Sequence, residues 1–208
     1  MNGNLLLQAK YNMTAIFYDI LDYPWERTYK EWRSTLLSDV RGNVLEAGVG
    51  TGRNLEYYHP TVQLTGFDLS EKMLYKARTR AKAASCAIKL IQEDATTMVS
   101  VASNHFDWVI STFMCCVMPD ALQVQAIEQF GRVLKPGGRF RLLEMVYSQN
   151  KKIRQRQDFF GPFVEWVYGA RWDRNTLRYL KQSSTLKVTH TSFLKEDVYL
   201  LIEGIRKA

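Results

Sequence analysis

The sequence predicts an α/β fold in which helices cover both faces of a seven-stranded, mostly parallel sheet. Short apolar segments alternate with amphipathic segments through the middle of the chain, a pattern typical of parallel strands joined by right-handed helical crossovers. Near the end, the strand-like segments Leu186–Leu194 and Val198–Ile205 are separated by only three residues. A connection this short permits only a hairpin, so the last strand must run antiparallel to its neighbours.

Two amphipathic helices are expected before the first strand. Apolar residues recur at near-helical spacing in Ala9–Tyr23 and Trp25–Val40, with Pro24 between them. Tyr11 and Tyr18 are seven residues apart and therefore share one helix face. We expect the pair to belong to a lid over a ligand, although aromatic residues at this spacing also occur in packed cores.

The segment Val44–Asn54, with the sequence VLEAGVGTGRN, joins the first apolar strand to a short helix over 54–58. Its glycines Gly48, Gly50 and Gly52 have no Cβ, so the backbone can adopt positive φ and approach a ligand closely. A turn of this kind can also be purely structural. Glu46 places a carboxylate at the end of the strand, where it suits a cation better than a pyrophosphate.

The spacing departs from the dinucleotide-binding fingerprint, which requires glycine where this chain has Arg53. A second strand, Val62–Asp68, ends in an acid that follows Gly48 by twenty residues, as expected for a carboxylate that binds a ribose. The same acid and Ser70 could instead cap the predicted helix Glu71–Ala84. Both roles are compatible.

Three further strands follow. Ile88–Gln92 leads to Asp94, which could accept a hydrogen bond from an adenine amino group or be an ordinary loop acid. Phe106–Thr112 is almost entirely apolar, as expected for a strand buried on both faces. A helix over Ala121–Val133 and a Pro-Gly-Gly turn precede the fifth strand, Phe140–Met145.

These segments together resemble the class I S-adenosylmethionine (SAM)-dependent methyltransferases, on the evidence of EAGVGTG, GFDLS, EDA, FDWVIST and LKPGGR. Tyr11–Asp22, Trp172–Thr176 and Tyr199–Glu203 are most similar to a branch that groups bacterial phosphatidylethanolamine N-methyltransferases with quinone-biosynthesis and microsomal thiol methyltransferases. The resemblance implies a Rossmann-like three-layer sandwich with an N-terminal helical lid, S-adenosyl-L-methionine as the cofactor, and no metal.

The resemblance and the strand ends together imply the cofactor site. Glu46 and the glycines would hold the methionine part, Asp68 the ribose, and Asp94 the adenine amino edge. The residues expected to bind SAM are Tyr11, Glu46, Gly48, Gly50, Gly52, Asn54, Asp68, Leu69, Met73, Asp94, Ala95, Thr112 and Phe113.

Methyl transfer requires in-line positioning, exclusion of water and a route for a proton to leave. Tyr18 and Glu144 are the candidate catalytic residues, although Glu144 could equally be held in a structural salt bridge. The residues expected to face the acceptor are Tyr18, Met114, Tyr147 and Arg174. Cys115 and Cys116 are interpreted as small apolar residues.

A chain of 208 residues with 46% hydrophobic content predicts one domain. We divide it into N-terminal helices (1–40), a cofactor-binding core (41–146), a helical insertion on the substrate side (147–180) and a terminal hairpin (181–208). Three cysteines without C-x-x-C spacing favour neither disulfides nor zinc and suit a reducing cytoplasm. No apolar run is long enough for a signal peptide or a membrane span.

A net charge of +7 favours anionic partners. Part of this charge lies in the segment 151–172, where lysines and arginines precede a series of aromatic residues. The segment could contact an anionic membrane, pack in the core through Phe159, Phe163 and Val167, or stack single-stranded bases. We favour membrane contact and expect no nucleic-acid partner. The expected location is the cytoplasm, peripheral to the inner face of the membrane.

The sequence therefore predicts a methyltransferase that acts on a lipid-associated or amphiphilic small molecule, with phosphatidylethanolamine-type head groups as the first candidate. A quinone precursor, a soluble amine or a thiol remains an alternative acceptor, and a non-catalytic SAM-binding protein is another alternative. An aminopropyl transferase would need an acidic cluster near the fourth strand, where only Asp120 occurs. Arg53 and the terminal hairpin argue against an NAD-dependent dehydrogenase.

Overall fold

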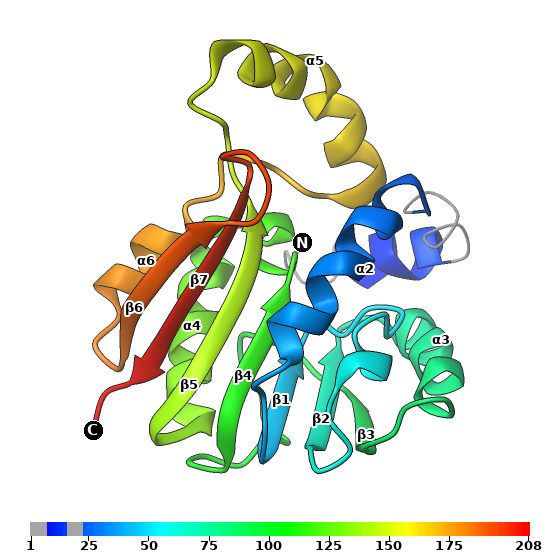
Figure 1. Cartoon of the computed structure of the whole chain (residues 1–208), viewed down its shortest axis with the longest axis vertical. Helices are drawn as coiled ribbons and strands as arrows, with labels where there is room; N and C mark the ends of the chain where they lie inside the picture. The colour runs from blue at the N-terminus through cyan, green and yellow to red at the C-terminus, as the bar shows by residue number, and fades with distance from the viewer. Residues whose placement is uncertain (1–7, 16–22) are drawn as a thin grey trace.

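The computed structural model describes residues 8–15 and 23–208 and contains one seven-stranded sheet with the order β3-β2-β1-β4-β5-β7-β6 (Figure 1). Its strands are β1 (Asn43–Ala47), β2 (Gln63–Asp68), β3 (Ala87–Gln92), β4 (Phe106–Thr112), β5 (Leu134–Met145), β6 (Leu186–Phe193) and β7 (Tyr199–Arg206). Strands β1 to β5 pair in parallel, whereas β7 is antiparallel to both β5 and β6. The predicted fold class is confirmed.

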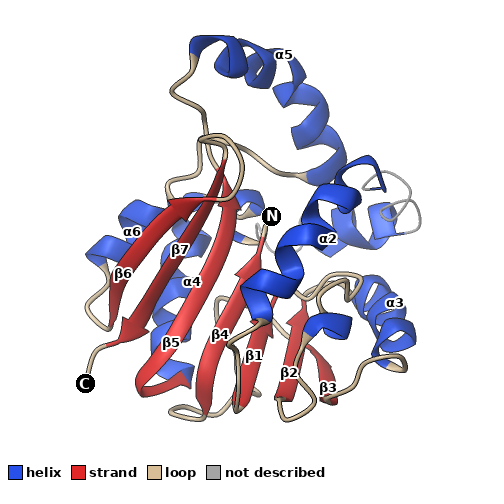
Figure 2. Ribbon diagram, in the orientation of Figure 1, coloured by secondary structure: helices blue, strands red, loops and turns tan. Residues whose placement is uncertain are grey.

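Helices flank both faces of this sheet (Figure 2). They are α2 (Tyr23–Leu37), α3 (Glu71–Ala81), α4 (Asp120–Val133), α5 (Lys151–Tyr168) and α6 (Thr176–Gln182), with short 3-10 turns η1 (Leu55–Tyr57) and η2 (Cys115–Val117). Residues 8–15 are also helical.

Side chains alternate between the two faces of each strand, and this alternation builds two apolar cores. Leu45 of β1 and Val109 of β4 belong to the core under α4 and α6. Val44 and Ile110, one residue away in each strand, belong to the core that includes Leu74 of α3 and the end of α2. The sheet is therefore the middle layer of a three-layer sandwich.

Two element boundaries differ from the expected ones. Pro24 does not separate two helices at its own position but lies in the first turn of α2. N–H groups in the first turn have no acceptor within the helix, so proline, which lacks an N–H, is tolerated there. The fifth strand begins at Leu134 rather than Phe140, because Leu134 pairs with Phe106 before a bulge in the ladder. Residues 16–22, which include part of the expected first helix, lie outside the described residues.

Helix α5 follows β5 and lies beyond the carboxyl ends of the parallel strands, beside the N-terminal helices (Figure 1). The Asn150 side chain caps it by accepting a hydrogen bond from the Lys152 N–H at 3.0 Å. The helix ends at Gly169, whose φ of +74° is the left-handed conformation common at helix ends. The alternative in which Phe159 and Phe163 pack in the core is wrong, because both side chains are exposed.

Candidate active site

The glycine turn after β1 has the backbone conformation that its sequence predicts. Gly48, Gly50 and Gly52 have φ angles of +70°, +55° and +84°. A Cβ on Gly48 would lie 2.8 Å from Cγ of Met114, so glycine is required there by space as well as by φ. A Cβ on Gly50 would meet no atom within 4 Å, because Gly50 borders the cavity described next. The turn therefore presents bare backbone to a ligand.

The cavity lies at the carboxyl ends of β1, β2 and β4 and spans about 1050 Å³ when the open space at its mouth is included. Clefts at this edge of an α/β sheet are where small-molecule ligands usually bind. Eleven of the thirteen residues expected to bind SAM line it, namely Tyr11, Gly48, Gly50, Asn54, Asp68, Leu69, Met73, Asp94, Ala95, Thr112 and Phe113. Their contacts with the cofactor remain predictions.

Asp68 at the end of β2 borders the cavity and contacts the glycine turn. Its Oδ2 accepts a hydrogen bond from the Gly50 N–H at 2.9 Å, and its Oδ1 accepts one from the Ser70 N–H at 2.8 Å. Ser70 itself is the N-cap of α3 and accepts from the Met73 N–H at 3.2 Å. Burial raises the pKa of Asp68 to about 6. Asp68 thus braces the turn and still borders the cavity.

Glu46 is not among the residues that line the cavity, and the expected contact between its carboxylate and a ligand cation stays a prediction. It is buried, and its Oε1 accepts a hydrogen bond from Nδ2 of Asn54 at 2.8 Å. Oδ1 of Asn54 accepts in turn from Nε of Arg33 at 2.8 Å. Burial raises the pKa of Glu46 to about 7. Its role here is to orient Asn54, which borders the cavity.

Gly52 also lies outside the cavity lining. A Cβ at this position would lie 2.7 Å from Cδ1 of Leu55 and 3.1 Å from Cβ of Ala77 on α3. The glycine is therefore needed for close packing between the turn and α3, and its expected contact with the cofactor stays a prediction.

Asp94 and Ala95, after β3, line the far side of the cavity. Oδ1 of Asp94 accepts hydrogen bonds from the N–H and the hydroxyl of Thr96 at 2.8 and 2.7 Å. The preceding acid, Glu93, accepts from the Ser100 N–H at 2.8 Å and fixes the same loop. These bonds hold the loop in place at the cavity edge.

Phe113, directly after β4, has a φ of +59°, which a residue other than glycine rarely adopts. Its N–H donates to the Leu143 carbonyl at 2.8 Å, which helps to hold this conformation. Such backbone outliers concentrate at functional sites. The ring centroid of Phe113 lies 5.0 Å from that of Tyr29 on α2, and both rings border the cavity.

Tyr29 and Arg33 were not expected in the site. They lie one turn apart on α2, and both line the cavity together with Arg53 from the glycine turn. Nη1 of Arg53 lies 2.8 Å from Oε2 of Glu26, and Arg33 also pairs with Glu26. Their i, i+4 spacing places them on one face of the helix, but it does not indicate that this face meets the cavity.

The helix over residues 8–15 closes one side of the cavity. Tyr11 lines it, and its hydroxyl donates to the Tyr168 carbonyl of α5 at 2.8 Å. The side chain of Gln8 donates to the Leu69 carbonyl at 3.1 Å. The predicted lid is therefore attached both to the cavity rim and to α5. Tyr18, expected to act in catalysis and in acceptor binding, lies outside the described residues.

Glu144 is not positioned to accept a proton in the cavity, so the structure gives no support to its expected catalytic role. The carboxylate is buried, and its two oxygens accept hydrogen bonds from the Cys115 and Cys116 N–H groups at 2.9 and 2.8 Å. Burial raises its pKa to about 7. Glu144 stabilises the η2 turn that leads away from Phe113.

Glu46, Glu144 and the partly buried Asp68 predict a pH-dependent stability. Because burial gives Glu46 and Glu144 pKa values of about 7 and Asp68 a pKa of about 6, the folded state takes up protons that the unfolded state has released. The free energy of unfolding should therefore fall as the pH rises from about 5 to about 8. Glu144→Gln should reduce this fall by up to about 3 kcal/mol. Urea unfolding at several pH values measures it, and an unchanged slope in the variant would contradict the assignment.

Of the residues expected to face the acceptor, Met114 lines the cavity, whereas Tyr147 and Arg174 do not. The Tyr147 ring stacks under the guanidinium of Arg154 at 3.4 Å, at the beginning of α5. Nη1 of Arg174 lies 3.8 Å from the Asp120 carboxylate at the beginning of α4. Both residues hold the connections around α5 rather than the cavity.

The described residues contain no group of three or more His, Cys, Asp or Glu side chains that could hold a metal ion. Likewise, no helix within residues 8–15 and 23–208 combines the length and apolar character needed to cross a bilayer.

The family model described as a methyltransferase domain, Methyltransf_25, matches residues 44–138. Phosphatidylethanolamine N-methyltransferase of Cereibacter sphaeroides is 33% identical over 98 residues, which are 47% of this chain and 47% of that protein, so the alignment spans about half its length. Demethylmenaquinone methyltransferase of Staphylococcus aureus is 30% identical over 75% of this chain and 67% of its own length. The ubiquinone/menaquinone C-methyltransferase UbiE of Roseobacter denitrificans is 29% identical over 86% of this chain and 74% of its own.

Solved structures show the same fold. The N-methyltransferase NodS from Bradyrhizobium japonicum superposes with a TM-score of 0.64 at 18% identity, over 90% of this chain and 99% of that one. The geranyl diphosphate C-methyltransferase from Streptomyces coelicolor, solved with S-adenosyl-L-homocysteine, has a TM-score of 0.64 at 13% identity, over 88% of this chain and 81% of that one.

Proposed function

This chain belongs to the class I SAM-dependent methyltransferases, and we propose that it methylates a lipid-associated or amphiphilic small molecule. The first candidate for the acceptor is the amine of a phosphatidylethanolamine-type head group. One observation carries the proposal. The cavity that contains the predicted SAM residues is also lined by the aromatic rings of Tyr29 and Phe113 and by the guanidinium groups of Arg33 and Arg53.

The residues present fit the cofactor. The turn at Gly50 offers bare backbone to the cavity, and the Asp68 carboxylate at its rim can accept hydrogen bonds from ribose hydroxyls. SAM, when bound, supplies a methyl group already activated by its sulfonium. The protein then needs to bind and orient both reactants and exclude water, which the lid helix over 8–15 and the aromatic wall can do.

The arginines suit the phosphate of a lipid head group. Arg33 and Arg53 share Glu26, so this cluster of three side chains carries a net charge of +1. A phosphodiester carries one negative charge and binds guanidinium groups through two oxygens. The faces of Tyr29 and Phe113 can stabilise the cation that develops on an amine as it accepts a methyl group.

A quinone precursor is the second candidate acceptor. The longer alignments with curated proteins are to quinone-pathway methyltransferases, and an aromatic ring would pack well against Tyr29 and Phe113. Such an acceptor requires no phosphate contact, so the arginine cluster distinguishes the two proposals. A soluble amine or thiol as acceptor, or SAM binding without methyl transfer, would be a separate outcome of the test.

The test is transfer of label from methyl-labelled SAM to phosphatidylethanolamine in mixed micelles, to a panel of quinone precursors and to soluble amines and thiols. Label in the ethanolamine lipid supports the first candidate, and label in a quinone precursor replaces it with the second. If the protein binds SAM but labels none of these acceptors, the proposed substrate class is wrong.

A further inference from the structure

The outer face of α5 exposes large aromatic side chains. The exposed fractions are 78% for Phe159, 54% for Phe163 and 77% for Trp166, whereas Val167, the next residue after Trp166, is 7% exposed. Scattered exposed apolar residues are ordinary on protein surfaces, but a contiguous set marks an interaction site. The Phe159 ring contacts Phe160 edge-on at 5.0 Å between centroids, but each of the three rings leaves more than half of its surface open to solvent.

Basic residues occupy the same face. At about 100° per residue, a single arc of about 140° contains Lys151, Pro162, Gln155, Trp166, Phe159, Lys152, Phe163 and Arg156. We call these residues the α5 face. Its first half is cationic and its second half is aromatic, and it contains no acid. The acids of α5, Asp158 and Glu165, lie outside the arc and pair with Arg154 and Arg171.

Helix α5 lies at the same end of the molecule as the cavity, beyond the carboxyl ends of the parallel strands (Figure 1). Helix α5 follows the carboxyl end of β5, and the lid helix joins it through the Tyr11 hydroxyl, which donates to the Tyr168 carbonyl at 2.8 Å, and through Lys10, which donates to the Glu165 carbonyl. Because Tyr11 also lines the cavity, α5 and the cavity wall share one connected structure. A surface bound at α5 would therefore lie close to the acceptor entrance.

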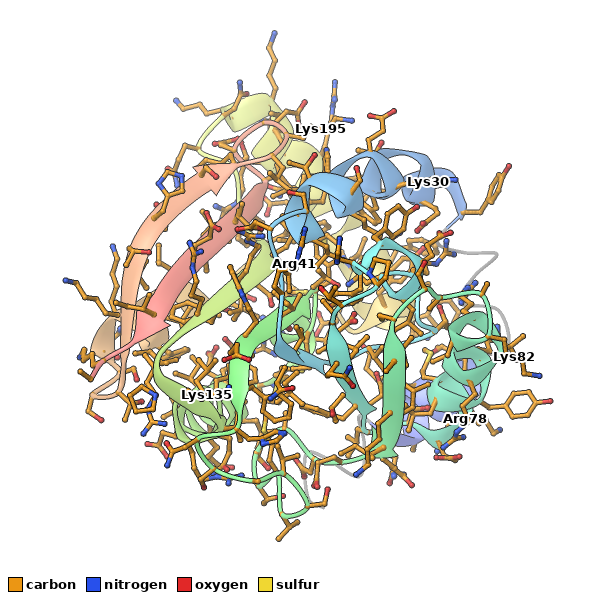
Figure 3. All side chains as sticks on the ribbon, turned by 60° about the horizontal axis from the view of Figure 1, so that its bottom comes forward. Lys30, Arg41, Arg78, Lys82, Lys135 and Lys195 are labelled. Carbon is orange, nitrogen blue, oxygen red and sulfur yellow. The ribbon has the colours of Figure 1, made fainter. Side chains whose placement is uncertain are left out.

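Other basic side chains surround this end without being confined to it. Figure 3 places Lys30 of α2 and Lys195 of the β6–β7 connection toward the upper end of the molecule, and Lys135 at the opposite end, with Lys82 after α3 to one side. The overall charge therefore assists attraction to an anionic surface, while the exposed aromatic residues distinguish the α5 face from the other basic parts of the surface.

We propose that the α5 face inserts into the interface of an anionic phospholipid bilayer and so brings the cavity to the membrane surface. Aromatic side chains partition into the interfacial region of a bilayer, and lysine and arginine are attracted to acidic head groups. Insertion of an amphipathic face combined with charge attraction supplies the two contributions that reversible membrane binding requires. The inference rests on the proposed function, because a lipid acceptor then reaches the cavity directly from the bilayer.

The test measures co-sedimentation of the whole protein with vesicles of phosphatidylcholine containing roughly one third phosphatidylglycerol. The combined variant Phe159→Ser, Phe163→Ser, Trp166→Ser should bind at least about tenfold more weakly. Lys151→Gln with Lys152→Gln and Arg156→Gln should weaken binding most at low salt, because about 0.5 M salt screens the attraction in the parent protein as well. Tyr75→Ser on α3, 72% exposed, and Lys82→Gln are the matched controls and should bind normally.

Each variant is also assayed for SAM affinity and for transfer to a short-chain acceptor dissolved as monomers, both of which must remain at parent values if α5 acts only in docking. Failure of the parent protein to bind the anionic vesicles overturns the docking inference even if methyl transfer occurs. Vesicle binding without transfer to any acceptor overturns the proposed function and leaves the docking surface intact. A dimer in lipid-free solution that the aromatic variant converts to monomer assigns the face to a second copy of this chain and overturns membrane docking.

Discussion

Asp68→Ala should lower the affinity for SAM by about a hundredfold or more. Two ribose hydroxyls can donate to its carboxylate, and a hydrogen bond to a charged acceptor contributes about 1.5 to 3 kcal/mol. The variant also removes the acceptor of the Gly50 N–H, 2.9 Å away, and so loosens the turn that faces the cofactor. Isothermal titration calorimetry of SAM and of S-adenosylhomocysteine measures the effect directly.

A matched control separates ligand binding from general damage. Asp107 is an acid on β4 that accepts a hydrogen bond from the Asn43 N–H at 2.8 Å and pairs with Lys135, away from the cavity lining. Asp107→Ala should reduce stability without changing the SAM affinity of the folded protein. If Asp68→Ala binds SAM as the parent does, the ribose assignment is wrong.

The same carboxylate makes SAM affinity pH-dependent. Burial raises the pKa of Asp68 to about 6, and only its ionised form accepts from both hydroxyls. Protons therefore compete with SAM, and affinity should decrease about tenfold for each pH unit below about 6 while remaining constant above about 7. Asp68→Asn should bind weakly at every pH, with this dependence removed.

Much of the cofactor site could be predicted because its determinants are local. Positive φ at three glycines and acids at the ends of β1, β2 and β3 follow from short stretches of sequence, and parallel strands bring their carboxyl ends to one edge. The direction of each side chain was the weaker part of the prediction. Glu46 lies on the face of β1 that packs toward α2 and α3, where it meets Asn54, a contact that strand position alone did not predict.

Glu144 illustrates the same limit. Leu142, two residues earlier in β5, belongs to the core under α4, and alternation places the Glu144 side chain on that face too. There it meets the N–H groups of Cys115 and Cys116 instead of the cavity. Because alternate residues of a strand face the same side, the apolar residues of β5 would have predicted that Glu144 faces the core. Its position at the end of the strand alone did not predict this.

Tyr29 and Arg33 show what sequence could not supply. Their helix is amphipathic, but how α2 crosses the glycine turn depends on tertiary packing, and no local signal records it. The orientation of α5 was equally open, since Phe159 and Phe163 fit either a core or an interface by spacing alone. Only the three-dimensional structure shows that α5 turns them outward.

Gly50→Ala should weaken SAM binding by about tenfold or more although the protein tolerates the new side chain. Gly50 has a φ of +55°, and a Cβ there meets no protein atom within 4 Å. The left-handed conformation costs an alanine about 1 to 2 kcal/mol, and the methyl group would occupy space into which the cofactor must come. The SAM affinity of the folded protein should therefore fall, in addition to the decrease in the free energy of unfolding.

Gly137 provides the control that makes this prediction decisive. It has a φ of +75°, a Cβ there also meets no atom within 4 Å, and it lies in β5 outside the cavity lining. Gly137→Ala should lower the free energy of unfolding by a similar amount and leave SAM affinity unchanged. Because the backbone penalty is common to both variants, any difference in calorimetric SAM affinity isolates the approach of the ligand to Gly50. Equal affinities would instead identify Gly50 as a structural turn residue, and the cofactor would have to be held by other parts of the cavity.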